Sequence, residues 1–326
     1  MNPRVAAWLV VGLVIPGVAQ SLPEIKSAGY SVPLRPRFAP GQPITLFVPG
    51  LNPPSGRCAD SINAGTLPLP TKLDGIVVSA LETSRLGGFS GDLPIFGITN
   101  LVCFGGVYAE SPNVTAVTVQ LPAVQFCPPE AGPNPCWYVP VVSVTVKKGG
   151  IPVASSPMVA VETSPHILNS CDTAVSPFLT EAVRIGQLMG GCYPLIAHSN
   201  GTIVTGQNPA HLGETVSIYA TGLRPIATDL IGKPTAESGV PVDASTIGLG
   251  FDFNPAIDPP PSQTPIEAHP VYVGLTPGLV GTYQINVVLP AASPSNGRTC
   301  GGFADTNVGI NLGFNGVITV RLCVSI

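Results

Sequence analysis

Proline is the feature that most constrains the fold of this chain, because 38 of its 326 residues are proline and they occur along most of the sequence. Proline lacks a backbone donor and clashes with the preceding turn of a helix, so it is confined to helix starts, turns and strand edges. The chain also has 37 glycines, which lack the every-third-residue spacing of collagen. A long helical or coiled-coil protein is therefore excluded, and short strands joined by many turns are expected.

Charged side chains are scarce, at 10% of the residues, and the net charge is −4. Apolar residues make up 44% of the chain, which is enough for a sizeable core and excludes a disordered protein. A nucleic-acid-binding protein would be expected to present a basic surface, and this composition is mildly acidic. We therefore expect a globular protein without a nucleic-acid partner.

Residues 1–19 have the pattern of a cleaved secretory signal. Arg4 supplies a positive charge, residues 5–15 form an apolar run, and small residues precede a cut after Ala19. That run is too short to cross a hydrocarbon core of about 30 Å as a helix, and no later run reaches the length of a membrane span. The expected location is extracytoplasmic: periplasm, cell surface or extracellular space.

The cysteines agree with export, because their number is even and all of them follow the predicted signal. The close Cys or His pairs of a zinc site do not occur in the sequence, so no metal site is predicted. Sequence alone leaves several pairings open. A nearest-neighbour pairing closes each segment on itself and predicts four disulfides: Cys58–Cys103, Cys127–Cys136, Cys171–Cys192 and Cys300–Cys323.

The chain contains an internal repeat. Three pairs of segments match in kind and in order: 41–51 with 213–223, 116–122 with 284–290, and 144–150 with 310–316. The repeat predicts two domains of the same fold, at residues 20–165 and 206–326.

Within each repeat, short β-branched and aromatic runs alternate with turn residues, which is typical of a β-sandwich. Residues 147–150 and the pair Asn315-Gly316 are expected at hairpin tips. Residues 166–205 are expected to be a connector closed by a disulfide. Apolar residues at helical spacing within 176–189 predict a short helix there, the alternative being an ordered loop with one helical turn.

The stretches 194–202, 208–210, 213–223 and 273–290 resemble the Solibacter-type uncharacterized C-terminal domain family. This resemblance covers most of residues 39–326, is strongest in the second repeat, and is weaker in the first, where Cys58 and Cys103 look like additions. The family consists of exported bacterial proteins with a pair of immunoglobulin-like sandwiches, and it carries no established activity. The resemblance therefore implies an all-β chain of two immunoglobulin-like β-sandwich domains in tandem, joined by a short, disulfide-closed, partly helical connector.

Motifs for chemistry are nearly absent from the sequence. Ser90 lacks the full nucleophile-elbow pattern, and Asp252 with Asp258 is a weak Ca²⁺ signal that solvated loop charges explain better. The four histidines, His166, His198, His211 and His269, give no metal-ligand spacing. We therefore predict no catalytic, cofactor-binding or metal-binding residues, no cofactor, and no enzyme activity.

The run 273–290 is expected to serve structure rather than ligand binding. Gly274, Pro277, Gly278 and Gly281 suit tight turns. In the same run Tyr283 is expected to pack in the core, and Gln284 and Asn286 are expected to bond loop backbone.

One ligand-contact candidate is Trp137 with its neighbour Tyr138, because exposed aromatic rings beside a disulfide loop can stack on sugars. The alternative is that one of the two faces the core, since neighbouring strand residues point to opposite sides.

Three functions follow from these patterns. The first is an exported, non-catalytic protein of tandem domains with an adhesive, envelope-structural or protein-contact role. The second is a carbohydrate-binding protein, which requires Trp137 or several tyrosines to be exposed. The third is an exported hydrolase with a site at the domain junction, which requires His, Asp or Glu side chains to converge in a cleft, for example His198 or His211 beside carboxylates. An extracellular protein or a glycan is the expected partner.

Overall fold

The structure is a computed structural model, and just over half of its described residues lie in strands, with turns, bends and irregular segments between them. In the described part of the chain the only helical element with assigned bounds is the 3-10 helix η1 (Thr228–Leu230). The predicted signal, at 1–19, and the predicted helix, within 176–189, lie outside the described residues. The described residues are 27–29, 37–51, 61–82, 88–100, 114–124, 140–169, 172, 194–236, 238–242, 244, 247–253, 266–293, 299–300, 306–313 and 317–326.

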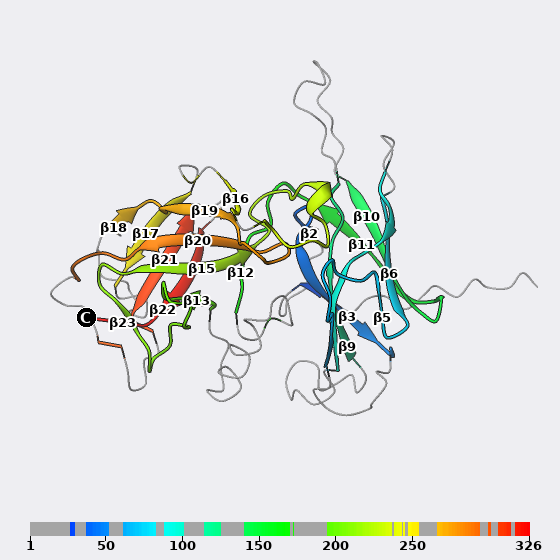
Figure 1. Ribbon diagram of the computed structural model, residues 1–326, viewed down its shortest axis with the longest axis horizontal. Coiled ribbons are helices and arrows are strands. Elements are labelled where there is room, and N and C mark those ends of the chain that lie inside the picture. The colour runs from blue at the N-terminus through cyan, green and yellow to red at the C-terminus, as the bar shows by residue number, and fades with distance from the viewer. Residues whose placement is uncertain are drawn as a thin grey trace, which may run out of the picture.

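The strands gather into two groups, which lie side by side in Figure 1. The N-terminal group has two sheets. The first has the order β1 (Ser27–Gly29), β3 (Pro43–Pro49), β9 (Val114–Gln120), β8 (Ile95–Asn100), β4 (Ser61–Asn63). The second has the order β2 (Arg37–Phe38), β11 (Ile151–Ala160), β10 (Val141–Lys148), β6 (Ile76–Glu82), β5 (Lys72–Leu73), with β7 (Ser90–Asp92) also on β6.

The C-terminal group is built in the same way. One sheet has the order β12 (His166–Ile167), β15 (Thr215–Thr221), β20 (Tyr283–Val288), β19 (Tyr272–Leu275), β16 (Val240–Pro241), with β13 (Ile196–Ala197) also on β15. The other has the order β18 (Ile266–Ala268), β17 (Gly248–Asp252), β21 (Val308–Gly313), β22 (Val317–Leu322). The short strands β14 (Ala210–His211) and β23 (Val324–Ser325) pair with each other.

Each group encloses its own hydrophobic core between its two sheets. Strand β10 shows how a strand contributes to the core. Val142, Val144 and Val146 are fully buried, and the residues between them are half-buried. Alternating side chains of a strand face opposite sides of the sheet, so one face of β10 supplies the core and the other covers it. The prediction of an all-β fold is confirmed.

The internal sequence repeat has a structural counterpart in the strand register. Strand β3 pairs with β9, and the matching strand β15 pairs with β20, both antiparallel. The pair Ile44–Val119 in the first sheet corresponds to the pair Val216–Val287 in the second. The matched segments are therefore the central strands of equivalent sheets.

The hairpin predicted at residues 147–150 is confirmed. Strands β10 and β11 are antiparallel neighbours, and Gly149 and Gly150 between them have φ angles of 58° and 85°. Two consecutive positive φ angles are what a tight hairpin turn requires, and glycine adopts them without a steric penalty. In the C-terminal group β21 pairs with β22 as expected, and the predicted turn residues between them lie outside the described ranges.

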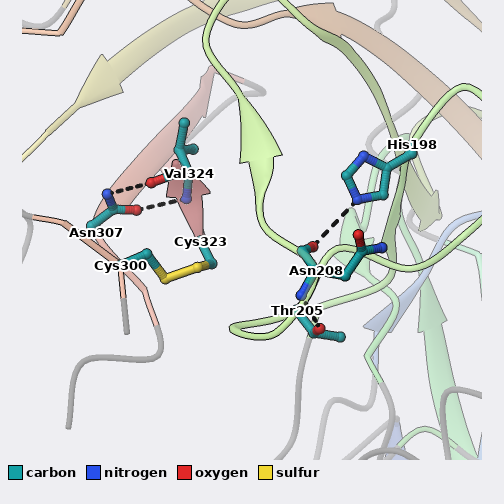
Figure 2. Close-up of a disulfide and its surroundings, with 7 residues drawn as sticks. All are labelled: His198, Thr205, Asn208, Cys300, Asn307, Cys323 and Val324. Carbon is teal, nitrogen blue, oxygen red and sulfur yellow. Dashed lines mark hydrogen bonds between the residues drawn. A yellow bond between two sulfur atoms is a disulfide. The ribbon is translucent and has the colours of Figure 1, made fainter. Parts of the chain in front are cut away.

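The C-terminus is held by a disulfide and by a buried amide. Cys300 and Cys323 are bonded, as predicted, with their Cα atoms 5.4 Å apart. Beside them the Asn307 side chain donates to the Val324 carbonyl and accepts from the Val324 amide, each at 2.7 Å (Figure 2). Asn307 thus gives Val324 the bonds that a neighbouring strand would supply. The predicted pairs Cys58–Cys103, Cys127–Cys136 and Cys171–Cys192 lie outside the described residues.

Among the described residues, no helix is long and apolar enough to cross a membrane.

Candidate functional site

The predicted ligand contacts Trp137 and Tyr138 lie outside the described residues, so this hypothesis stays a prediction. Ser90 lies in the short strand β7, and Asp252 ends β17. The described part of the chain contains no group of three or more His, Cys, Asp or Glu side chains that could hold a metal ion.

The run 273–290 serves the fold in part as predicted. Tyr283 is 2% exposed, and its hydroxyl donates to the Arg224 carbonyl at 3.1 Å. Burial raises the pKa of this phenol well above its usual value, so the hydroxyl stays a donor. Gly278 and Gly281 have positive φ angles of 73° and 66°, as their predicted turns require.

Two expectations for this run were wrong. Gly274 lies inside strand β19 rather than in a turn, and a Cβ atom there would collide with the ring of Tyr272. Gln284 and Asn286 bond neighbouring side chains on the sheet rather than loop backbone. Both differences arise because this part of the run is a strand whose outward face carries these residues.

His198 is brought beside Glu214, which the sequence could not show. Its Nδ1 lies 2.6 Å from Glu214 Oε1. Its Nε2 lies 3.3 Å from the Asn208 carbonyl oxygen (Figure 2). The other carboxylate oxygen of Glu214 accepts the backbone N–H of His211 at 2.9 Å. These contacts tie together the loops that precede and follow β14.

The electrostatics of this contact favour an ionised Glu214. Partial burial raises the pKa of its carboxyl, but the bond from the His211 amide, the bond from His198 and the charges of both histidines outweigh burial and lower it. Both ring nitrogens of His198 face oxygen atoms of the protein, so the ring is held from two sides.

A second histidine, His166, contacts a buried carboxyl. Its Nε2 lies 2.8 Å from Asp172 Oδ2, which also accepts the Asn169 amide at 2.7 Å. Burial raises the pKa of Asp172, opposed by the bond and charge of His166 and by Asn169. This contact joins β12 to the residues that follow it.

The two groups of strands meet through buried glutamines. Gln42 is 1% exposed, and its Nε2 donates to the Ser164 carbonyl at 2.8 Å and to Thr221 Oγ1 at 3.4 Å. Its Oε1 accepts the Ala39 amide at 2.8 Å. Gln42 therefore links the entry of β3 to the end of β15 with all its hydrogen-bonding atoms engaged.

Gln120 forms the second link. It is fully buried at the end of β9, and its Nε2 donates to the Gly41 carbonyl at 2.9 Å. Its Oε1 accepts the backbone N–H of Gly232, in the C-terminal group, at 2.5 Å. The Gly232 carbonyl in turn accepts the Leu69 amide at 2.7 Å. Both the amide and the carbonyl of Gly232 are thus hydrogen-bonded to the N-terminal group.

Apolar contacts complete this junction. Leu168, Leu195 and Val280 belong by contact to the core of the N-terminal group, although they lie in or beside the C-terminal strands. A cavity of about 20 Å³ next to Leu168, Leu195 and Tyr219 has room for about one water molecule. The junction is therefore packed, and this cavity is too small for an organic substrate.

The sequence analysis did not single out Gln42 or Gln120. The available signal was an amide residue inside an otherwise apolar strand segment, GQPITL for Gln42 and AVTVQLP for Gln120. Such a residue must find buried partners, but nothing in one sequence says where those partners lie.

No protein-family model and no curated protein matches the sequence.

Proposed function

We propose that this chain is an exported bacterial protein of two immunoglobulin-like domains in tandem, related to the Solibacter-type family, which makes non-catalytic contacts at or beyond the cell envelope. Its two domains act as one rigid piece that presents surfaces to a partner. A rigid pair of domains holds its surfaces at a fixed distance and angle, which suits an adhesive or protein-contact role.

The hydrogen-bonded junction is the observation that carries the proposal. Gln42 and Gln120 are buried and cross from one group of strands to the other, and the Ile226 amide donates to the Pro40 carbonyl at 2.9 Å. A buried polar group without its partner costs about 1–3 kcal/mol, so opening this junction is unfavourable at several points at once. A fixed junction sets the distance and angle between surfaces on the two domains.

Export is supported by the Cys300–Cys323 disulfide, because structural disulfides persist in oxidising compartments and are rare in the cytosol. It is also supported by the signal pattern of residues 1–19.

Among the described residues, His166 and His198 are engaged in structural contacts with carboxylates. One contact of the kind that the hydrolase hypothesis names, His198 beside Glu214, is present. However, both ring nitrogens face acceptors, and the only histidine–carboxylate contact otherwise described joins His166 to a buried Asp172. These contacts favour a role in holding loops over a role in proton transfer.

The test uses the oxidised chain from residue 20, labelled with a fluorophore and titrated onto envelopes of the bacterium that exports it. We expect saturable binding that unlabelled protein displaces, and weaker binding by Gln120→Met, which breaks the link at Gly232. Gln207→Met, at an exposed glutamine outside both the junction and the strands of the C-terminal sheets, controls for loss of an amide at another site. The proposal would be overturned by the absence of envelope binding, or by hydrolysis of an envelope component that His198→Ala abolishes.

A further inference from the structure

In the C-terminal group, the outward face of the sheet β12-β15-β20-β19-β16 carries an aromatic ring beside two amide side chains. Tyr272 on β19 is partly exposed, and it is paired across the sheet with Asn286 on β20. Gly274 is paired with Gln284 in the next outward position. We call Tyr272, Gly274, Gln284 and Asn286 the tyrosine platform.

The ring of Tyr272 lies over the backbone of Gly274. A Cβ atom at Gly274 would come within 2.7 Å of the ring carbon Cζ, and one at Gly239 would come within 2.6 Å of the phenol oxygen. The hydroxyl reaches the Leu275 carbonyl at 3.4 Å. The hydroxyl end of the ring is therefore held against the backbone of β19 and of Gly239, and the ring as a whole is partly exposed.

The amides beside the ring keep unused hydrogen-bonding atoms. Gln284 Nε2 donates to Asn286 Oδ1 at 2.7 Å and to Ser217 Oγ at 3.2 Å. Ser217 also donates to Asn286 Oδ1, at 3.0 Å. These bonds fix both amides, and within the described structure they leave Gln284 Oε1 as an acceptor and Asn286 Nδ2 as a donor without protein partners.

The strands that carry and border the platform have no charged acidic or basic side chain. Strands β15, β16, β19 and β20 contain no Asp, Glu, Lys, Arg or His. A charged ligand would therefore find no counter-charge on these strands, whereas a neutral polar ligand needs only hydrogen-bond partners there.

We propose that the tyrosine platform binds a neutral sugar ring of a glycan. The C–H groups on one face of a pyranose carry small positive charges and stack on the negative face of an aromatic ring. Neighbouring hydroxyl groups of the same sugar both donate and accept, so they match Gln284 Oε1 and Asn286 Nδ2. The platform is prearranged, because the ring is held by Gly274 and the amides by Ser217, so little side-chain freedom is lost on binding.

This site differs from Trp137 and Tyr138, and the inference does not depend on the proposed function. The test is a titration of the oxidised chain from residue 20 with neutral tetrasaccharides (cellotetraose, maltotetraose and chitotetraose), followed in spectra of the side-chain NH₂ groups. We expect at least one sugar to bind and to shift the signals of Gln284 and Asn286.

Substitutions at Tyr272 and Gln284 separate the contribution of ring stacking on the sugar from that of hydrogen bonds to it. Tyr272→Ala should weaken binding by about tenfold or more, which corresponds to about 1.4 kcal/mol, while Tyr272→Phe keeps the stacking face and should stay within about threefold of wild type. Gln284→Leu should also weaken binding, and Thr215→Ala, on the same sheet, should not. Thermal unfolding of each variant shows that it is folded.

Three results would overturn the inference: no binding of any neutral sugar, equal binding by wild type and Tyr272→Ala, or binding that Trp137→Ala alone abolishes. Envelope binding that survives Tyr272→Ala would leave the proposed function standing without this site. Sugar binding without envelope binding would leave the site standing without the proposed function.

Discussion

Replacing Gln120 by Met tests the junction most sharply, because methionine has nearly the same length and shape but can neither donate as the amide does nor replace its strong acceptor oxygen. The substitution removes the bond from Gln120 Nε2 to the Gly41 carbonyl and the bond from the Gly232 amide to Gln120 Oε1. Both Gly41 and Gly232 are buried, so water does not replace the lost partners freely.

The expected magnitude follows from these two groups. Each buried group left without a partner costs about 1–3 kcal/mol, and the more apolar methionine offsets about 1 kcal/mol, which gives a net loss of about 3 kcal/mol. Urea unfolding measures this loss, and hydrogen exchange reports whether the Gly232 amide exchanges faster. Gln284→Met is the matched control and should cost less than about 1 kcal/mol, because its amide is partly exposed. The reasoning would be refuted if Gln120→Met lost less than about 0.5 kcal/mol and Gly232 exchanged at the wild-type rate.

Three further predictions concern stability. Asn307→Leu should cost about 2–4 kcal/mol in urea unfolding, because it leaves the buried amide and carbonyl of Val324 without their partners; a loss below 1 kcal/mol would contradict this assignment. The double variant Cys300→Ala/Cys323→Ala should lose about 3 kcal/mol, as expected for a loop of 23 residues, and an unchanged melting temperature would count against it. The pKa of Glu214 is lowered from 4.5 in the folded protein, so ionised Glu214 contributes to stability above that pH, and the contribution is lost as the pH falls through the folded pKa. Glu214→Gln should therefore flatten the acid side of the curve of stability against pH. An unaltered curve would refute the contact.

Much of the fold could be predicted from local patterns. The alternation in residues 141–146 and the glycines at 149–150 indicate a strand and a hairpin without any tertiary information, and both are present. The match between 41–51 and 213–223 indicated equivalent strands, and β3 and β15 occupy equivalent positions in their sheets. The disulfide Cys300–Cys323 followed from sequence proximity.

Contacts between distant segments could not be predicted in this way. Gln120 and Gly232 are bonded across 112 positions of sequence, and no periodicity connects them. Gly274 was expected in a turn because glycine is common in turns, but here it gives Tyr272 room to lie on the sheet. His198 and Glu214 gave no signal because their approach depends on how two loops fold back onto β15.

The measurement that tests the central claim most directly is a set of residual dipolar couplings from backbone amides of the oxidised chain from residue 20. If the two groups of strands form one rigid piece, a single alignment tensor fits the couplings of β3, β9, β15 and β20 together. Two tensors that differ in magnitude or direction would show that the groups move independently, and they would contradict the proposal that the junction presents both surfaces in a fixed arrangement.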